Sequence, residues 1–574
     1  MYYNFKVDIP DVPGKIYLKK IKESTYVNYE YDRVYKKDKK YNIPKRTTIG
    51  KRCDDDEKKM YPNPNFIKYF PDVQLPTDDG RTDRSSCLRI GTHLVIQKVV
   101  SDALLDRILD SIYSSDERGT GLFLDLAAYS IITENNAGQY YPDYAYNHPL
   151  FTAGHRIYSD ATVSEFIRQI SINDSVKFQN EWNSTKDHRE KIYISYDSTN
   201  KNCQAGDIDI VEFGHAKDDK GEPVFNYSIA YDTQNREPLF YEEYPGSIVD
   251  VSQLQLMLDK AKSYGYRHAG FILDRGYFSR ENIRFMDKCG YDFVIMIKGM
   301  KELVSESVLE VKGSFENRRR NSIRDYNANG TTIKRKVFLS DEKDRYVHVY
   351  YNADRCAAER NNLQAKLDKM EYALRKLEGK PVVVEKSYEK YFHIEYFHEG
   401  KDDQCFVCAI PKEDVIDREL ELCGYFCILT SEEMSAKEAL ELYKSRDESE
   451  KLFRADKTFL GNRSLRVHSS EALDGKMLIE FVALIIRNRI HTAIKNELNE
   501  MLNKPNFMNV PAAIRELEKI EMIRQADGVY RLDHAVTANQ KTILKAFGMD
   551  AAYVKKKAHE LSERLKPQTV TVKI

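Results

Sequence analysis

The sequence predicts an α/β protein built from several domains, and three observations support this prediction. With 574 residues, the chain is too long for one hydrophobic core. After Lys191, three strand-like runs follow one another with short connections typical of antiparallel neighbours: IYISYDST, DIDIVEFG and VFNYSIAYD. Helix-like and strand-like runs then alternate as far as DFVIMIK, which is typical of a parallel sheet with helical crossovers.

The order of these runs is βββαβαβ, which is that of a ribonuclease H-like core. After this core segment comes a long excursion that contains β-type runs such as RYVHVYYNA and FHIEYF. It also contains a charged helix over residues 354–378, whose apolar side chains recur at steps of four and three and predict a coiled-coil-like seam. The core is expected to resume at GYFCILT and then at a helix that opens with a capping box of Ser435 and Glu438.

These patterns predict six segments along the chain. They are a β-rich basic module that could contact DNA (1–90), a helical domain (91–188), the first part of the ribonuclease H-like core (189–300), a mixed β/coiled-coil insertion (301–422), the second part of the core (423–500) and a C-terminal helical region (501–574).

Composition places the chain among ordinary globular proteins, because 41% of its residues are hydrophobic and 31% are charged. No run is long and apolar enough to predict a membrane span. The start, MYYNFKVDIPDVPGK, lacks the basic and apolar pattern of a secretory signal. We therefore expect a cytoplasmic protein whose nine cysteines are thiols.

The net charge of −1 gives no sign of nucleic-acid binding, but basic residues are clustered locally. The stretch RVYKKDKKYNIPKRTTIGKR, residues 33–52, holds nine basic residues and one acidic residue. A second cluster consists of Arg318, Arg319, Arg320 and Arg324. Either cluster could follow a phosphate backbone, and either could be a solvated surface.

Two aspartates stand where neighbouring strands are predicted to end. Asp197 ends the first strand of the core and Asp274 ends the strand HAGFILD, so the two carboxylates are expected to meet at one edge of the sheet. Glu450 can add a third carboxylate from the helix after the last strand. Hard divalent ions prefer oxygen ligands, and two ions about 3.5 to 4 Å apart can activate a water or a 3′-hydroxyl in phosphodiester chemistry. The three acids therefore predict a metal site.

The stretch YKSRDESEKLFRADK, residues 443–457, surrounds Glu450 with a pattern of polar side chains. If it forms one exposed helix, then Tyr443, Arg446, Glu450 and Lys457 share a stripe about 60° wide. The two cations could hold phosphates beside the metal site, while the tyrosine offers a hydroxyl and a stacking face. Taken alone, such a helix is more often an ordinary solvated surface.

The spacing Y-(2)-R-(3)-E-(6)-K matches the signature of bacterial insertion-sequence transposases of the DDE class, whose ribonuclease H-like core is interrupted by a β-rich insertion domain. YDST around Asp197, DRGYFS after Asp274 and the GxxxD pattern from Gly246 to Asp250 also resemble motifs of that family. The resemblance covers residues 190–300 and 425–495, and more weakly the flanking helical segments.

This resemblance implies cut-and-paste movement of a DNA element, with release of flanking DNA through a hairpin and strand transfer by the 3′-hydroxyl. It implies that Asp197, Asp274 and Glu450 bind two Mg²⁺ or Mn²⁺ ions, and that Tyr443, Arg446 and Lys457 contact the transferred DNA end. The expected partners are double-stranded DNA, as terminal inverted repeats and target, and a second copy of the chain in the synaptic complex. The place of action would be the bacterial nucleoid.

One departure from the family concerns base capture. Relatives can use a tryptophan of the insertion domain to hold a flipped base, but the single tryptophan of this sequence, Trp182, precedes the core. Base capture must use another aromatic residue or be absent.

Three alternatives remain open. Cys405, Cys408, Cys423 and Cys427 have a spacing close to that of a zinc ribbon, but they lie in apolar strand-like runs and are expected to be buried thiols. A ribonuclease H-like nuclease without strand transfer would use the same three acids. A transposase-derived DNA-binding protein without activity is disfavoured by the intact acids and signature.

Overall fold

The computed structural model describes residues 2–3, 5–36, 40–73, 84–203, 208–213, 222–248, 250–297, 301–338, 341, 343–398, 404–461 and 464–565. The chain forms two compact units. The sheet unit consists of Asn183–Asn202 and Asp209–Phe453, and the helix-rich unit of Met1–Trp182, Cys203–Ile208 and Arg454–Ile574. None of the helices in the described part combines the length and apolar character that crossing a membrane requires.

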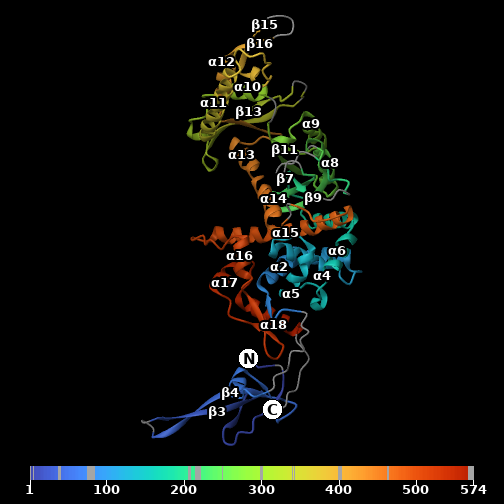
Figure 1. Cartoon of the computed structure of the whole chain (residues 1–574), viewed down its shortest axis with the longest axis vertical. Coiled ribbons are helices and arrows are strands. Elements are labelled where there is room, and N and C mark those ends of the chain that lie inside the picture. The colour runs from blue at the N-terminus through green and yellow to red at the C-terminus, as the bar shows by residue number, and fades with distance from the viewer. Residues whose placement is uncertain are drawn as a thin grey trace. The chain divides into compact units, whose positions relative to one another are not determined.

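The sheet unit is built on one mixed sheet, which can be followed in Figure 1 from β9 to β13. Its strands β7, β8 and β9 are antiparallel, whereas β7, β10 and β11 run parallel to one another. The strand order is β12 (Ser322–Ile323), β13 (Ala328–Arg335), β14 (Arg345–Tyr351), β17 (Tyr425–Thr430), β11 (Asp292–Met296), β10 (Ala269–Leu273), β7 (Ile192–Asn202), β8 (Val224–Asp232) and β9 (Glu237–Pro245).

One predicted strand is wrong. Within DIDIVEFG, the described residues 208–213 form a single bridge between Glu212 and Val224 and no strand. The third antiparallel strand is β9, which contains EPLFYEEYP. Since β8 pairs with β7 along its length and with β9 from Phe225 onward, only Val224 is left for a bridge to DIDIVEFG, and Phe213 is 76% exposed.

Helices pack on both faces of this sheet. On one face, α8 (Asp250–Ser263) and α9 (Arg280–Cys289) cover a core that includes Phe271 and Leu273. On the other face, α13 (Ala436–Lys444) packs against Ile272. Alternate residues of β10 thus face opposite cores, as the pleat of a buried strand requires. The predicted capping box of Ser435 and Glu438 begins α13 and is confirmed.

The segment predicted as an insertion, 301–422, contributes to two sheets. Its strands β12, β13 and β14 extend the large sheet through β17, which is antiparallel to both β11 and β14. The predicted apolar seam lies on α11 (Ala353–Arg375) but packs within its own domain rather than against a second helix of a coiled coil. Its partners are β15 (Phe392–His398), β16 (Gln404–Pro411) and α12 (Glu413–Glu421). The sheet unit also contains α10 (Lys301–Val311).

The helix-rich unit contains two further sheets. A five-stranded antiparallel sheet near the N-terminus has the order β1 (Val7–Asp8), β5 (Lys59–Pro62), β4 (Tyr41–Arg52), β3 (Ser24–Lys36) and β2 (Ile16–Ile21). Helix α1 (Pro64–Tyr69) covers its core through Phe66. A three-stranded sheet joins β6 (Cys87–Arg89) to β18 (Glu521–Arg524) and β19 (Tyr530–Leu532).

The helices of this unit pack around the long apolar helix α15 (Ser470–Glu500), which contacts α2, α4, α6 and α16. Ser159 caps the N-terminus of α6, because its side chain accepts a hydrogen bond from the Thr162 amide. The other helices are α2 (Gly91–Asp102), α3 (Leu105–Tyr113), α4 (Gly119–Thr133), α5 (Tyr141–Asn147), α6 (Asp160–Gln169), α7 (Ile172–Ser184), α16 (Val510–Leu517), α17 (Ala538–Lys545) and α18 (Ala551–Arg564). The predicted segment boundaries stay predictions.

Candidate functional site

The strand register explains why Asp197 and Asp274 both lie close to the guanidinium of Arg446. In the parallel pair β7–β10, Tyr196 pairs with Leu273, so each aspartate is the next residue of its chain. Asp197 does not end its strand as predicted, because β7 continues to Asn202 in its pairing with β8. It stands where β10 stops, at the carboxyl end of the parallel pair, which is where ligands commonly bind in open α/β sheets.

Backbone amides hold both aspartates in place. The Asp197 carboxylate accepts a hydrogen bond of 2.9 Å from the Ser198 amide. The Asp274 carboxylate accepts one of 2.7 Å from the Arg275 amide and caps the short 3₁₀ turn Arg275–Tyr277. Each carboxylate is therefore fixed by its own chain before any ligand is present.

The expected single helix over residues 443–457 is wrong. Helix α13 ends at Lys444 and α14 (Asp447–Phe459) begins three residues later, so Arg446 lies between them. Two serine hydroxyls favour this break, because Ser445 donates to the Leu442 carbonyl and Ser449 donates to the Arg446 carbonyl. Acidic residues in the first turn of α14 further favour a new helix start.

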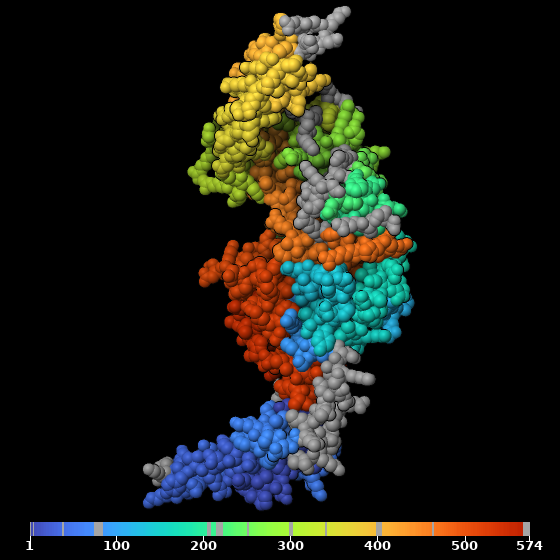
Figure 2. Space-filling model, in the orientation of Figure 1, coloured from blue at the N-terminus to red at the C-terminus, as the bar shows by residue number. Residues whose placement is uncertain are grey.

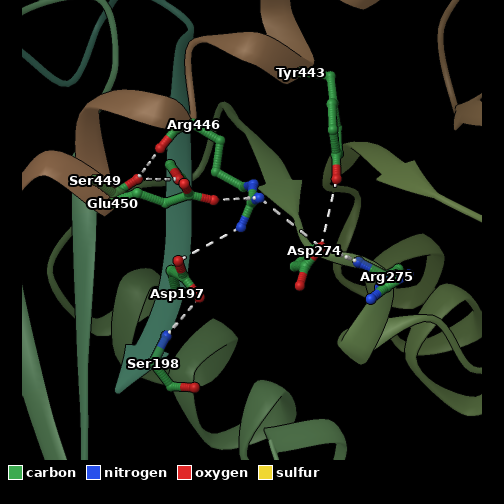
Figure 3. Close-up of polar contacts among 9 residues, drawn as sticks. Asp197, Ser198, Asp274, Arg275, Tyr443, Arg446, Ser449 and Glu450 are labelled. Atoms are coloured by element: carbon green, nitrogen blue, oxygen red, sulfur yellow. Dashed lines mark hydrogen bonds and ion pairs between the residues drawn. The ribbon is translucent and has the colours of Figure 1, made fainter. Parts of the chain in front are cut away.

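The Arg446 guanidinium lies among all three predicted acids, as Figure 3 shows. Its Nη2 donates to Glu450 Oε1 at 2.6 Å and lies 4.0 Å from Asp274 Oδ1. Its Nη1 lies 3.5 Å from Asp197 Oδ2. The arginine side chain is 13% exposed, against 15%, 37% and 49% for Asp197, Asp274 and Glu450. One mostly buried cation thus joins carboxylates from two strands and a helix.

The charges of this site follow from burial and from the acids. Burial alone would lower the pKa of the Arg446 guanidinium, but its negatively charged neighbours, which include the carboxylates of Asp197, Asp274 and Glu450, outweigh burial and raise that pKa. Burial likewise raises the pKa of Tyr443 well above its usual value. Tyr443 is therefore a neutral donor, and its hydroxyl lies 3.4 Å from Asp274 Oδ1. Its ring packs in the core beneath α13 and is not exposed, contrary to the prediction.

Two serines of the site were missed by sequence reasoning. The Ser195 and Ser449 hydroxyls lie 2.7 Å apart, and both side chains are fully buried. Because Ser449 donates its proton to the Arg446 carbonyl, Ser195 is the donor in this pair. The contact ties β7 to the first turn of α14 next to Glu450. Two signals could have found it: Ser195 lies two positions before Asp197, on the same face of β7, and Ser449 directly precedes Glu450.

The structure also describes other residues that were singled out in the sequence. Lys457 lies in the last turn of α14, and its phosphate contact stays a prediction. Gly246 has no room for a Cβ, because a Cβ would lie 2.3 Å from the Val224 carbonyl oxygen. The side chain of Asp250 lies outside the described part of the structure. Trp182 lies in α7 and is fully buried. Burial raises the pKa of the Cys427 thiol to about 12, which opposes a thiolate there.

The three carboxylates form an all-oxygen set of the kind that hard divalent cations prefer. As the side chains stand, no group of three or more His, Cys, Asp or Glu in the described part of the chain is arranged to hold a metal ion. The Arg446 guanidinium lies between the acids instead. The acids already converge on a positive charge, so their chemistry and position fit a metal ion once this guanidinium moves aside.

The fold and the site together define a mixed α/β protein in which three acids surround an arginine side chain at the end of two parallel strands. A family model described as "Transposase DDE domain" matches residues 194–486, slightly more than half of the chain. The chain belongs to this DDE-domain transposase family. The resemblance noted from the sequence is thereby confirmed at the level of the family.

Comparison with individual proteins adds little to this assignment. No curated protein matches the chain. A solved structure of the piggyBac transposase synaptic complex with hairpin DNA matches at 8% sequence identity and a TM-score of 0.28. The match covers 72% of this chain and 66% of that chain, slightly less than two thirds of its length. A likeness at this level does not identify equivalent residues, and the residues of the site are assigned from their own geometry.

Proposed function

We propose that the protein is a DNA transposase that cuts DNA at the ends of an insertion sequence and joins the freed 3′-hydroxyl to target DNA. The observation that carries this proposal is the convergence of Asp197, Asp274 and Glu450 on one guanidinium. The strand order β9-β8-β7-β10-β11, with three antiparallel strands followed by parallel ones, supports a ribonuclease H-like core. Membership of the DDE-domain family agrees with both points.

In this proposal the three acids hold two Mg²⁺ or Mn²⁺ ions. Such ions activate a water or a 3′-hydroxyl and stabilise the leaving oxygen of a phosphodiester. The protein supplies the fixed positions of the ligands. Asp197 and Asp274 are held by backbone amides, and Glu450 by the contact of its helix with Ser195.

The cations of the signature would bind DNA phosphates. Arg446 would exchange its carboxylate partners for a phosphate beside the scissile bond, because a planar guanidinium grips phosphate with two parallel hydrogen bonds. Lys457 would bind a neighbouring phosphate as a point charge. Tyr443 would keep its hydroxyl on Asp274 and position that carboxylate rather than stack on a base, since its ring is buried.

The partners follow from the reaction. The DNA would be duplex that carries the terminal inverted repeats of the element, together with a target duplex. Because both ends of an element must be joined to the target together, we propose that the working form is at least a homodimer in the synaptic complex.

A strand-transfer assay distinguishes this function from its rivals. The terminal repeats are first identified in the DNA that flanks the gene, and a labelled duplex with one repeat is incubated with the protein, a supercoiled plasmid and Mg²⁺. A transposase yields cut ends, hairpins if they form, and label joined to the plasmid. A nuclease yields cut ends without joining. Binding without cutting would indicate a transposase-derived DNA-binding protein and would reject the proposed function.

A further inference from the structure

The strands β3 and β4 form a ribbon that extends beyond the rest of the N-terminal sheet; its segments are blue in Figures 1 and 2. Strand β2 pairs with β3 only over Ser24–Tyr29, and β5 pairs with β4 only over Gly50–Arg52. From Asp32 to Lys36, β3 pairs with β4 alone among the described residues. We call residues 31–36 and 40–46 the outer ribbon. Two strands without a covering layer cannot bury a core of their own.

The outer ribbon is strongly basic and exposed. It holds one acidic residue, Asp32, against five exposed basic residues: Arg33, Lys36, Lys40, Lys45 and Arg46. Asp32 lies 3.5 Å from the Lys45 ammonium group and is the single acid of the outer ribbon, so the basic charges outnumber it there. An elongated surface of one sign attracts a polyanion, even in a chain whose net charge is −1.

A buried carboxylate at the base of the outer ribbon holds two of these cations in place. Glu30, which is 2% exposed, accepts hydrogen bonds from Arg33 Nε at 2.6 Å and from Arg46 Nε at 3.1 Å. The Arg46 guanidinium also lies 3.8 Å from the centre of the Tyr17 ring. Both contacts to Glu30 use Nε, while the arginine side chains stay 61% and 43% exposed. Their terminal nitrogens are therefore pre-oriented and accessible to further acceptors.

Exposed aromatic side chains lie beside the charges. Tyr35 is 57% exposed and Tyr41 is 55% exposed, although aromatic side chains as large as tyrosine usually pack at least one ring face. They belong to the neighbouring pairs Tyr35–Asn42 and Lys36–Tyr41, so they lie on opposite faces of the ribbon. Apolar rings on both faces and cations along the strands suit a ligand that surrounds the ribbon.

We propose that the outer ribbon inserts into the major groove of double-stranded DNA, with its cations on the phosphates of both groove walls. This proposal rests on the proposed function in one respect only: that function identifies the bound DNA as the end of a mobile element. The B-DNA major groove is about 12 Å wide and admits a two-stranded ribbon, whose strands lie about 4.8 Å apart. Duplex RNA is excluded as the preferred ligand, because its major groove is too deep and narrow for side chains.

The test uses the full-length protein and a fluorescent DNA duplex of mixed sequence about 30 base pairs long, roughly three helical turns. The first variant, Lys36→Gln with Lys40→Gln and Lys45→Gln, leaves the Glu30 contacts intact. We expect at least a tenfold rise in Kd at moderate salt. The slope of log affinity against log salt should also become less steep by about two to three, since each lost phosphate contact releases roughly one counterion fewer.

A second variant tests the groove contact itself. Tyr35→Ser with Tyr41→Ser keeps every charge, so it should weaken binding without changing the salt slope. Dimethyl sulfate, which methylates guanine N7 in the major groove, should reveal guanines that the wild-type protein protects and the lysine variant does not. A duplex RNA of the same sequence should compete poorly with the DNA.

The matched control removes three exposed lysines of the same unit: Lys541→Gln, Lys555→Gln and Lys556→Gln. Equal loss of affinity in the control would show that overall charge, and not the ribbon, drives binding. Unchanged affinity of the ribbon variants, guanine N7 reactivity unaffected by the protein, or equal competition by duplex RNA would each overturn the proposal. If the lysines merely prevent edge-to-edge pairing of strands, the lysine variant should aggregate with its DNA affinity unchanged, which also overturns it.

Failure of this proposal can be told apart from failure of the proposed function. Binding is measured in parallel on the Asp197→Asn protein, which cannot cut DNA under the proposed function. Ribbon-dependent binding without strand transfer by the wild-type protein would reject the function alone. Normal strand transfer with ribbon-independent binding would reject the ribbon alone.

Discussion

The Arg446 guanidinium donates a 2.6 Å hydrogen bond to Glu450, and the same group lies beside both aspartates of the site. The two residues are four positions apart, yet Arg446 lies in the break between α13 and α14 whereas Glu450 lies in the first turn of α14. The arginine is thus close enough to the acids to act either as their counter-ion or, once released, as a ligand for a phosphate. Substitutions of Arg446 and its neighbours can test both the counter-ion role and the phosphate-binding role.

The position of Arg446 predicts competition with divalent cations. Replacing Arg446 by alanine removes the positive charge among the acids, so Ca²⁺ should bind several-fold more tightly, because a partly exposed ion pair is worth up to about 1 kcal/mol. The rise in Tm with Ca²⁺ concentration measures this affinity without any chemistry. Arg275→Ala is the matched control, since Arg275 is exposed and adjoins Asp274 in the chain. Equal or weaker Ca²⁺ binding by Arg446→Ala would show that the guanidinium does not compete.

Arg446 and Lys457 should matter more for joining than for binding. Arg446→Ala and Lys457→Ala should slow strand joining by about a hundredfold, since misplacing reacting atoms by about 1 Å costs that much, while end-binding weakens far less. Arg446→Lys should also fail, because an ammonium group cannot reproduce the two parallel hydrogen bonds of a guanidinium. Lys457→Arg should be milder. Single-turnover joining of a pre-cut end measures all four, and near wild-type rates for both alanine variants would leave these cations without a mechanistic role.

The buried pair of Ser195 and Ser449 should couple the sheet to the Glu450 helix. Ser195→Ala, Ser449→Ala and the double variant form a cycle in which a coupling energy of about 0.5–1.5 kcal/mol is expected from the lost hydrogen bond. Both single variants should also cut DNA more slowly at saturating Mg²⁺, because Glu450 loses its positioning. Urea unfolding and single-turnover cleavage provide the two readouts. If the changes in the free energy of unfolding are additive and cleavage is normal, the two serines do not couple the sheet to the Glu450 helix.

Much of the site could be predicted from the sequence because its key features are local. Strand patterns ended near Asp197 and Asp274, and parallel neighbours place such residues at one edge of a sheet. The capping box of Ser435 and Glu438 likewise predicted the start of α13. The break at Ser445 and Arg446 was missed, because residue offsets are the same in one helix and in two. The position of Arg446 among the acids depends on that break.

Other features could not be predicted because they depend on long-range pairing. Strands β12, β13 and β14 join the large sheet through β17, and no local pattern encodes which strand edge they extend. DIDIVEFG alternates as a strand should, but β9 already pairs with the free edge of β8. The apolar seam of α11 has coiled-coil spacing, and only the fold shows that β15, β16 and α12 cover it.

The most direct test of the central claim is Mg²⁺-dependent cleavage of an element end by the variants Asp197→Asn, Asp274→Asn and Glu450→Gln. These substitutions keep the size of each side chain and remove its charge, so folding and DNA binding should remain, with Tm close to that of the wild-type protein. Each should lower the single-turnover cleavage rate by at least about a hundredfold, the typical cost of losing one transition-state electrostatic contact. Cleavage within a few-fold of wild type by any one of the three would remove that residue from the site and contradict the three-carboxylate account.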